Sequence, residues 1–428
     1  MYMAKIAFIG PGSVVFASRL LSDIFCHPEL RESTISLMDI DAERLGLIDK
    51  LAGLMASKYA PNAEIESTLD RREALKDSDY VIIMIQVGGL EAFELDINIP
   101  LEYGVNQEVG DTMGPGGVFR GLRTIPVLLD ICRDMQDLCP DALLINYANP
   151  MAINCWAMNK ATDIGNVGLC HSVQGTAMQL ARYIDVSYED VSYWVAGINH
   201  QAFFLEYRYK GEDAYPLIWK ASRKKEIYEK DRVRFEMMRH LGYFITESSH
   251  HLSEYVPYFR TTEDRRKEYC EPRWFYLGIC KEAWKPHYEH VRKQIRGEEP
   301  IEISRSHEYG VDIIHSIETG NACRINGNVA NDWLITNLPY GCCVEVPCLV
   351  DKNGIHPCYV GDLPPQCAAL NRTNINVQEL AVKAALDQDR TAAKQAVMFD
   401  PLTSAILTPR EIEKMVEEMF KAEAQWVF

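Results

Sequence analysis

The sequence predicts an α/β fold, in which a Rossmann-like, doubly wound parallel sheet is followed by a mixed α+β domain. Short, continuously apolar segments alternate with helical segments over the first 150 residues. A glycine-containing turn follows the first apolar segment, and the regular alternation ends after Pro150. Apolar strands separated by helices are typical of a parallel sheet that is covered on both faces.

The apolar pattern and its punctuation place the elements of each half. In the first half we expect strands at residues 5–9, 35–38, 81–85 and 142–146, and helices reaching residue 25 and spanning 41–59 and 125–138. In the second half we expect strands at 193–196, 202–209 and 343–350, and helices at 225–240, 378–387 and 409–423. The chain is therefore divided into a domain of residues 1–195 and a domain of residues 196–428. The charged run at residues 224–234 predicts a solvated helix face.

The composition is that of an acidic globular enzyme. The 428 residues carry a net charge of -17, which disfavours nucleic acid and anionic membrane surfaces as partners and favours a small neutral or cationic substrate. No apolar run is long enough to span a bilayer, and the chain enters a strand pattern without a signal-peptide pattern, so we expect a cytoplasmic protein. The 13 scattered cysteines do not suggest a disulfide framework.

The turn after the first strand is a candidate dinucleotide site. Gly10 and Gly12, followed by Ser13, stand between a strand and a helix, where glycine lets backbone N–H groups approach a pyrophosphate. The third glycine of the usual fingerprint is replaced by Val15. Asp39 ends the next strand, where an acid accepts hydrogen bonds from a ribose hydroxyl and favours NAD over NADP. The alternative is a structural turn with a helix-capping aspartate.

Two further strand ends reach the same edge of the predicted sheet. Gln86 follows the strand at 81–85 and is expected at the nicotinamide end of the cofactor. Asn146 and Asn149 follow the strand at 142–146, and Pro150 favours an extended Asn149 whose amide points into the crevice. The alternative for this segment is an Asx turn.

Cys170 and His200 are candidate metal ligands on separate strand ends. A thiolate and an imidazole can share one divalent ion and leave coordination positions open for sugar hydroxyls and water. The alternative is a buried cysteine beside a histidine whose hydrogen bonds are satisfied.

Several motifs together resemble glycoside hydrolase family 4, and within it the α-galactosidase branch. They are GPGS at 10–13, MDID at 38–41, GDTMGPGGVFRGLRTIP at 110–126, NYANPM at 146–151, CHSVQGT at 170–176, GINH at 197–200, GDLPPQCAALNRTNINVQEL at 361–380 and DPLT at 400–403. The likeness runs along nearly the whole chain. It implies NAD and Mn²⁺, or another divalent transition metal, as cofactors, and a homodimer or homotetramer.

The resemblance also implies roles for individual residues. Cys170 and His200 would hold the metal, and Asn149 would hold the sugar near its C2 and C3 hydroxyls. His171, directly after the cysteine, would contact substrate and take part in catalysis; phospho-sugar members have Asp or Asn there. Asp111 stands where the family has an acid before a glycine-rich loop. Arg120, together with Arg123 from the same motif, would orient substrate or a cofactor phosphate.

The catalytic base is expected in the segment TESSHHLSEY at residues 246–255. Other family members have Tyr or Asp as the base in this segment, and no residue here aligns cleanly with either. We favour Glu247, with His251 and Tyr255 as the alternatives. A helix-capping or surface role for Glu247 is the structural alternative.

The implied reaction hydrolyses an α-glycoside, most readily an α-galactoside such as melibiose, through a redox cycle. Oxidation of the sugar at C3 by NAD⁺ acidifies the C2 proton, a base removes it, the aglycone is eliminated, water adds, and the hydride returns. Related specificities are α-galacturonidase, α-glucuronidase and α-glucosidase. An NAD-dependent hydroxyacid dehydrogenase on a lactate/malate dehydrogenase-like scaffold and a non-catalytic NAD- or sugar-sensing protein are the alternatives outside the family.

Overall fold

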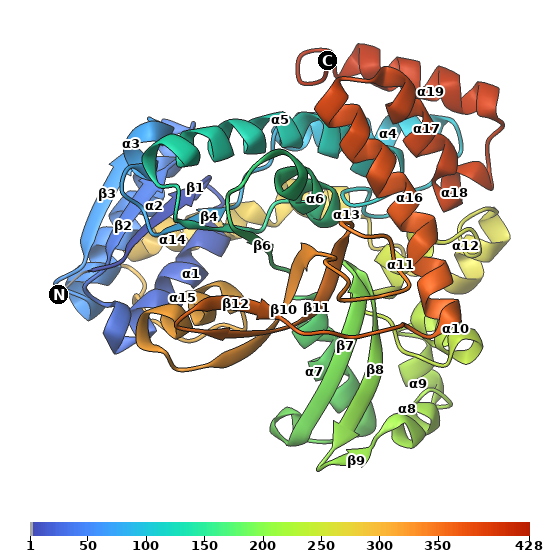
Figure 1. The fold of residues 1–428 in the computed structure, drawn as a ribbon, viewed down its shortest axis with the longest axis horizontal. Coiled ribbons are helices and arrows are strands. Elements are labelled where there is room, and N and C mark those ends of the chain that lie inside the picture. Colours follow the sequence, from blue (N-terminus) through green and yellow to red (C-terminus); the bar gives the residue numbers. More distant parts are fainter. Residues whose placement is uncertain (1–2) are drawn as a thin grey trace.

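The computed structural model describes residues 3–428, and these form one 12-stranded sheet flanked by helices (Figure 1). The strands follow the order β3-β2-β1-β4-β5-β6-β10-β11-β7-β8-β9, and β12 pairs with β11. Their bounds are β1 Lys5–Ile9, β2 Thr34–Met38, β3 Glu64–Thr68, β4 Tyr80–Ile83, β5 Leu143–Asn146, β6 Asn166–Gly168, β7 Val191–Ile198, β8 Gln201–Tyr209, β9 Glu212–Asp213, β10 Cys323–Ala330, β11 Cys343–Asp351 and β12 Gly354–Pro357.

The helices cover both faces of the sheet and build the red C-terminal layer of Figure 1. Those of the first half are α1 Val14–Cys26, the short η1 Pro28–Leu30, α2 Ala42–Tyr59, α3 Arg71–Leu75, α4 Gly89–Glu102, α5 Gly114–Leu138, α6 Met151–Ala161, α7 Ser172–Ile184 and the short η2 Tyr188–Asp190. Those of the second half are α8 Tyr215–Ala221, α9 Lys225–Tyr228, α10 Arg232–Leu241, α11 Ser249–Tyr255, α12 Glu263–Tyr269, α13 Tyr276–Glu282, α14 Trp284–Ile295, α15 Tyr309–Thr319, α16 Pro365–Asp387, α17 Arg390–Phe399, α18 Pro401–Ser404 and α19 Pro409–Ala422.

The first six strands in the sheet order are parallel, and the predicted Rossmann-like fold is confirmed. The central strand β4 is buried along its whole length and β1 along nearly all of it, which explains their continuous apolar sequences. The chain leaves β1 toward β2 on one side, whereas β4 lies on the other side. The carboxyl ends of β1 and β4 are therefore the point at which the strand order reverses, the position where doubly wound sheets bind ligands.

One predicted loop is instead the start of a long helix. We expected a glycine-rich loop before a helix at 125–138, but α5 begins at Gly114. A Cβ on Gly116 would lie 2.5 Å from the carbonyl oxygen of Gly110, and one on Gly117 would lie 2.4 Å from the carbonyl carbon of Thr112. The glycines are therefore required because the first turn of α5 packs directly on the preceding backbone, a long-range reason that local helix propensity does not contain.

The antiparallel half continues the same sheet from β6 through β10. Strand β7 runs across residue 195, and the division of the chain at that residue stays a prediction. The helix expected at 225–240 is split into α9 and α10, and the solvated face predicted for the charged run is wrong at Asp231 and Arg234. These two side chains are buried and form an ion pair. Arg234 is drawn into the interior because its guanidinium also donates to the backbone carbonyls of Ile245 and Glu247.

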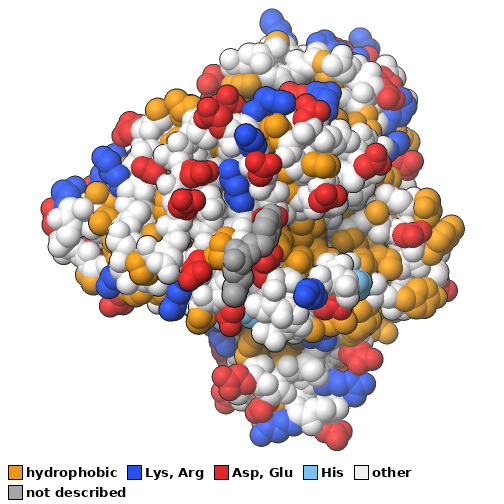
Figure 2. Space-filling view, turned by 60° about the vertical axis from the view of Figure 1, so that its left-hand side comes forward, with side chains coloured by type: hydrophobic (Ala, Val, Ile, Leu, Met, Phe, Trp, Pro, Cys, Tyr) orange, Lys and Arg blue, Asp and Glu red, His pale blue; other side chains and the backbone are white. Residues whose placement is uncertain are grey.

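The surface agrees with the charge pattern of the sequence. On the face shown in Figure 2, acidic and basic side chains are interspersed, without a continuous basic area. Within residues 3–428, none of the helices combines the length and apolar character required to cross a membrane.

Candidate active site

The turn between β1 and α1 has the backbone geometry that its sequence predicts. Gly10 has a φ of +89°, and a Cβ there would lie 2.8 Å from Ile85. A Cβ on Gly12 would lie 2.5 Å from a carboxylate oxygen of Asp39, to which the Gly12 N–H donates a 2.7 Å hydrogen bond. Both glycines are thus required, the first by conformation and the second by close approach.

The same turn leaves an anion-binding helix terminus exposed. Ser13 precedes α1 but its side chain does not cap the helix, so N–H groups of the first turn remain available for a phosphate. Asp39 is not a helix cap, because α2 is capped by Asp41. Tyr288 of α14 donates a hydrogen bond to the carbonyl oxygen of Gly12, a contact across the chain that no local pattern indicated.

The other two predicted cofactor residues turn toward their own loops. The Gln86 amide donates to the carbonyl of Gly89 at 3.1 Å and is otherwise exposed. Asn146 is fully buried, and its amide both donates to and accepts from the backbone of Ala148. Asn146 therefore builds the turn after β5, and its predicted cofactor contact stays a prediction, as does that of Gln86.

Cys170 and His200 lie side by side, although 30 residues separate them in the chain. The sulfur of Cys170, which follows β6, is 3.1 Å from Nε2 of His200. His200 occupies the two-residue turn between β7 and β8 with a φ of 61°, a conformation that is unfavourable for a residue with a side chain. Its Nδ1 lies 3.2 Å from the Tyr255 hydroxyl and 3.4 Å from the Thr112 hydroxyl, which directs Nε2 toward the sulfur.

The pKa of Cys170 shows that the Cys170–His200 pair needs a cation for the sulfur to be a thiolate. Burial raises the pKa of the Cys170 thiol to about 11, and the charge of Glu247 adds to this effect. A thiol with that pKa is protonated at neutral pH, whereas metal ligation requires the thiolate. A divalent cation between sulfur and imidazole supplies the positive charge that favours the thiolate.

Three predicted site residues meet beside this pair: Asn149 and Arg120, which were expected to bind substrate, and Asp111, which was expected to take part in catalysis. The Asn149 amide donates to Asp111 at 3.1 Å, and the Arg120 guanidinium donates to the Asn149 carbonyl at 3.2 Å. Asp111 also accepts a 2.8 Å hydrogen bond from Thr112. Burial alone would raise the pKa of Asp111, but Arg120 and the histidines His251 and His200 together lower it. Asp111 is thus held as a carboxylate in a buried site.

The expected base segment contributes a carboxylate–imidazole pair. Glu247 is ion-paired with Nδ1 of His251, and Ser248 lies 2.8 Å from the same nitrogen. Ser248, not Glu247, caps α11, and the Glu247 side chain is only 17% exposed, so neither the capping nor the surface alternative applies. Burial opposes ionisation of Glu247, but His251 lowers its pKa well below the ordinary value. The His251 ring lies 4.8 Å from that of His200.

Glu254 is a site residue that the sequence did not indicate. Its buried carboxylate accepts hydrogen bonds from the N–H groups of Glu108 at 2.6 Å, Val109 at 3.2 Å and Gly110 at 2.9 Å. Burial raises the pKa of Glu254 to about 7. The side chain ties α11 to the segment that presents Asp111, and only the spatial contact reveals it.

Two predicted residues lie away from the buried centre. The side chain of His171 is 69% exposed, and its Nδ1 lies 3.8 Å from Glu308, so it stands at the rim. Arg123, expected near substrate or phosphate, is instead completely buried in an ion triad with Asp96 and Glu423. That expectation for Arg123 is corrected: its guanidinium has two carboxylate partners and no access to a ligand.

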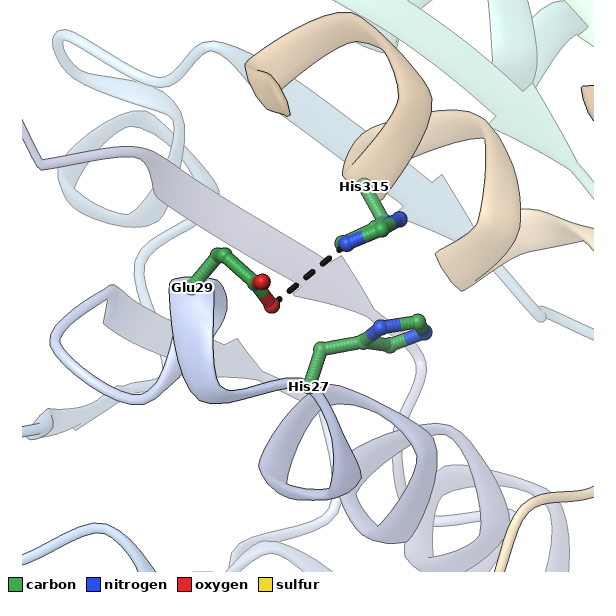
Figure 3. A group of neighbouring side chains, drawn as sticks. All are labelled: His27, Glu29 and His315. Carbon is green, nitrogen blue, oxygen red and sulfur yellow. Dashed lines mark ion pairs between the residues drawn. The ribbon is translucent and has the colours of Figure 1, made fainter. Parts of the chain in front are cut away.

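A second cluster of potential metal donors, drawn in Figure 3, is formed by His27 and Glu29 after α1 and by His315 of α15. Nε2 of His315 lies 3.4 Å from Glu29, and its ring stacks on His27 at 4.0 Å. The guanidinium of Arg305 binds Nε2 of His27 and also pairs with Asp312. Burial and the adjacent Arg305 lower the pKa of His27 to about 4. Because a fixed cation already contacts His27, we interpret this cluster as a joint between α1 and α15.

The residues at the crevice fit both implied cofactors. The glycine turn, the uncapped α1 terminus and Asp39 match the requirements of a dinucleotide. The convergent sulfur and imidazole match a divalent transition metal, with positions left open for a substrate. Fold and site together indicate a Rossmann-like, dinucleotide-binding enzyme, and the Cys170–His200 pair is its candidate metal-binding centre.

Comparison with known proteins identifies the family. A model described as "Family 4 glycosyl hydrolase" matches residues 5–186, and "Family 4 glycosyl hydrolase C-terminal domain" matches residues 195–403. An α-galactosidase of Bacillus subtilis (strain 168) is 42% identical, with 99% of each chain covered. An α-galactosidase of Rhizobium meliloti (strain 1021) is 38% identical, covering 99% of this chain and 89% of the relative. The chain belongs to family 4 of the glycosyl hydrolases, which confirms the predicted family.

A solved structure carries the same fold over the whole length. The 6-phospho-α-glucosidase from gut microorganisms in complex with NAD and Mn²⁺ has a TM-score of 0.85, with 22% identity, 100% of this chain and 99% of that chain covered. At that identity the similarity establishes the fold.

Proposed function

We propose that this enzyme is an α-galactosidase, hydrolysing α-galactosides such as melibiose with bound NAD and a divalent cation such as Mn²⁺. The observation that carries the proposal is the 3.1 Å approach of Cys170 to His200 at the sheet edge where the dinucleotide turn also ends. The two α-galactosidases that align over nearly all of this chain support the galactoside over other hexosides. When bound, the dinucleotide serves as hydride acceptor and donor, and the cation serves as a Lewis acid.

The chain's own residues position the sugar. Asn149, held by Asp111 and Arg120, presents its amide next to the Cys170–His200 pair. The lowered pKa of Asp111 keeps a negative charge there that can accept hydrogen bonds from sugar hydroxyls. Orientation by a fixed network of this kind is a large part of the rate enhancement in enzymes.

His251 is the proton acceptor that the geometry supports best. Glu247 and Ser248 bind its Nδ1, and within residues 3–428 its Nε2 has no hydrogen-bond partner. Glu247 is committed to that imidazole, which lowers its own basicity. We therefore assign the proton transfer at C2 to His251 and its orientation to Glu247, with Tyr255 serving to orient His200.

Hydrolysis of nitrophenyl glycosides tests the function directly. We expect release of nitrophenol from the α-galactoside, dependent on both NAD and Mn²⁺, and much slower release from the α-glucoside and the α-galacturonide. NADH should not accumulate, because the hydride returns in each cycle. Preference for the galacturonide would contradict the galactoside assignment, and stoichiometric NADH growth without hydrolysis would indicate a dehydrogenase.

We further infer a homo-oligomer, a dimer or a tetramer, in the cytoplasm. Support comes from an exposed aromatic cluster formed by Trp333 (57% exposed) and Tyr340 (62% exposed), whose rings lie 5.3 Å apart. All 13 cysteines are free, as a reducing compartment requires. Light scattering of the purified protein measures the mass, and a monomer at micromolar concentration would contradict the oligomer.

A further inference from the structure

Glu345 is a buried carboxyl group without a satisfying partner. It lies near the start of β11 with 0% exposure, and within the described part of the chain neither carboxyl oxygen has a hydrogen bond of normal geometry or an ion pair. The neighbouring Asn328 commits its amide nitrogen to the carbonyl of Gly168 at 3.2 Å. Burial raises the pKa of this carboxyl group well above its ordinary value, so a nearby cation is what would favour its ionised form.

The sheet register places Glu345 between the two ligand-bearing segments. Gly168 of β6 pairs with Asn328 of β10, Asn328 pairs with Glu345 of β11, and Glu345 pairs with Gly197 of β7. Residues paired directly across strands point to the same face of a sheet. Cys170 follows one end of this row by two residues, and His200 follows the other end by three. Both are close enough for their charges to act on the Glu345 carboxyl.

The row of paired residues Gly168, Asn328, Glu345 and Gly197 packs closely against the helices α6 and α16, because its two end residues are glycines. A Cβ on Gly168 would lie 2.6 Å from the sulfur of Cys155 in α6, and a Cβ on Gly197 would lie 3.0 Å from Asn371 in α16. The covered space still contains unsatisfied polar atoms: both amide atoms of Asn199 and the amide oxygen of Asn328 lack partners among the described residues. Buried polar atoms in such number are normally satisfied by water or an ion.

We propose that Glu345 is a further protein group of the metal centre, a buried carboxyl group that ionises to balance the cation held by Cys170 and His200. A divalent ion with one thiolate and one neutral imidazole keeps a net charge of +1, which is unfavourable in a buried site. An ionised Glu345 carboxylate offsets this positive charge and increases the affinity for the ion. Glu345 is thus a positioning residue, and this inference rests on the proposed function because it requires the Cys170–His200 centre.

Metal affinity measured in the absence of substrate tests the role. Mn²⁺ binding to the full-length protein is followed by electron paramagnetic resonance for the wild type, Glu345→Gln and Cys170→Ser. We expect Glu345→Gln to weaken binding about 10- to 100-fold, as is usual for the outer shell of metal sites, and to leave NAD affinity unchanged. The matched control is Glu423→Gln, another buried carboxyl that lies in the Arg123 triad, and its Mn²⁺ affinity should equal that of the wild type.

The outcomes separate the inference from the function. Mn²⁺ affinity of Glu345→Gln within twofold of the wild type overturns the inference, whereas equal binding by the wild type and Cys170→Ser overturns the centre itself. A purely structural role would lower the melting temperature of the metal-free Glu345→Gln protein; we expect that temperature to be unchanged or higher. If that variant does not fold, the Mn²⁺ anomalous signal in crystals of the wild type decides: an ion separated from the Glu345 carboxylate by more than one water overturns the proposal.

Discussion

At the residue scale, the site depends on two histidines, in each of which one ring nitrogen is held by the protein and the other is directed into the site. His200 presents Nε2 to the sulfur of Cys170 because Nδ1 is occupied by Tyr255 and Thr112. His251 is held in the same way, with Nδ1 bound to Glu247. Fixing one nitrogen selects the tautomer and the direction of the other, which is how a neutral imidazole becomes a ligand or a base.

The assignment of His251 leads to a test at a single atom. We expect His251→Asn to lower kcat by about 10²- to 10⁴-fold and to abolish solvent deuterium incorporation at C2 of the product, because general-base catalysis has that magnitude. Glu247→Gln should lower kcat less and retain measurable incorporation. The matched control is His240→Asn, whose side chain is 73% exposed, and its kcat should be unchanged. Abolished exchange in Glu247→Gln together with retained exchange in His251→Asn would return the role to Glu247.

At the scale of elements, short turns between strands and helices carry the functional groups. The β1–α1 turn presents backbone N–H groups, the β7–β8 turn presents His200, and the turn after β5 presents Asn149. Each turn is fixed by hydrogen bonds to side chains from other segments: Gly12 to Asp39, His200 to Tyr255, and Asn149 to Asp111. The elements are therefore rigid supports, and the chemistry lies at their ends.

The dinucleotide turn can be tested by adding one methyl group. Gly12→Ala would place its Cβ 2.5 Å from Asp39, so we expect NAD affinity to fall at least about tenfold, the equivalent of 1.4 kcal/mol, as Asp39 is displaced. Gly46→Ala is the matched control, because a Cβ on this α2 glycine meets nothing within 4 Å and should stabilise the protein by about 0.5–1 kcal/mol. Calorimetric titration with NAD measures the first effect and thermal unfolding the second; unchanged NAD affinity in Gly12→Ala would exclude the turn as the site.

The cap of α18 predicts a pH dependence of stability. Asp400 is fully buried and accepts 2.8 Å and 2.7 Å hydrogen bonds from Thr403, and burial raises its pKa from 3.8 to about 6. Between these pH values the unfolded chain has lost the proton that the native state keeps, so stability falls as pH rises. The loss is about 3 kcal/mol for a shift of about two pH units.

Replacement of Asp400 by Asn removes this contribution. The free energy of unfolding of Asp400→Asn minus that of the wild type should rise by about 3 kcal/mol between pH 4 and pH 7, measured by urea denaturation. A difference that stays constant with pH would show that Asp400 is ionised throughout in the native state.

At the scale of the whole molecule, one continuous sheet joins the two halves, and the C-terminal helices close over it (Figure 1). The Arg123 triad connects α5, α4 and the segment after α19, with 300 residues between Arg123 and Glu423. Arg123 also donates to the carbonyl of Val87, the residue that follows Gln86 in the loop after β4. The C-terminus is thereby linked to the cofactor side of the crevice.

The triad predicts a large effect on stability. Arg123→Met should destabilise the protein by about 3–5 kcal/mol, because it leaves the carboxyl groups of Asp96 and Glu423, which share one negative charge, buried without their cation. Arg133→Met on the same helix is the control: its side chain is 68% exposed, and the change should stay within about 0.5 kcal/mol. Equal melting temperatures for the two variants would refute the contribution of the triad.

The family, the α/β class and the apolar strands of the first half were predictable because they depend on local patterns, whereas the polar edge strand β3 was not predicted. Apolar strands, helix periodicity and a glycine turn are recorded in neighbouring residues, and Cys170, His200 and Asn149 stand in recognisable motifs. The start of α5 and the burial of Arg234 were not predictable, since glycine contacts and carbonyl partners from distant segments decide them.

By itself the sequence determined which chemical groups the protein possesses and at which strand ends they stand. Only the tertiary structure decided which groups meet: that Glu247 binds His251 instead of facing solvent, that Arg123 is enclosed by Asp96, and that Glu345 pairs with Gly197 on the strand that leads to His200. The physical reason is that strand pairing and burial join residues far apart in the chain, and a side chain's charge state and direction follow from those neighbours.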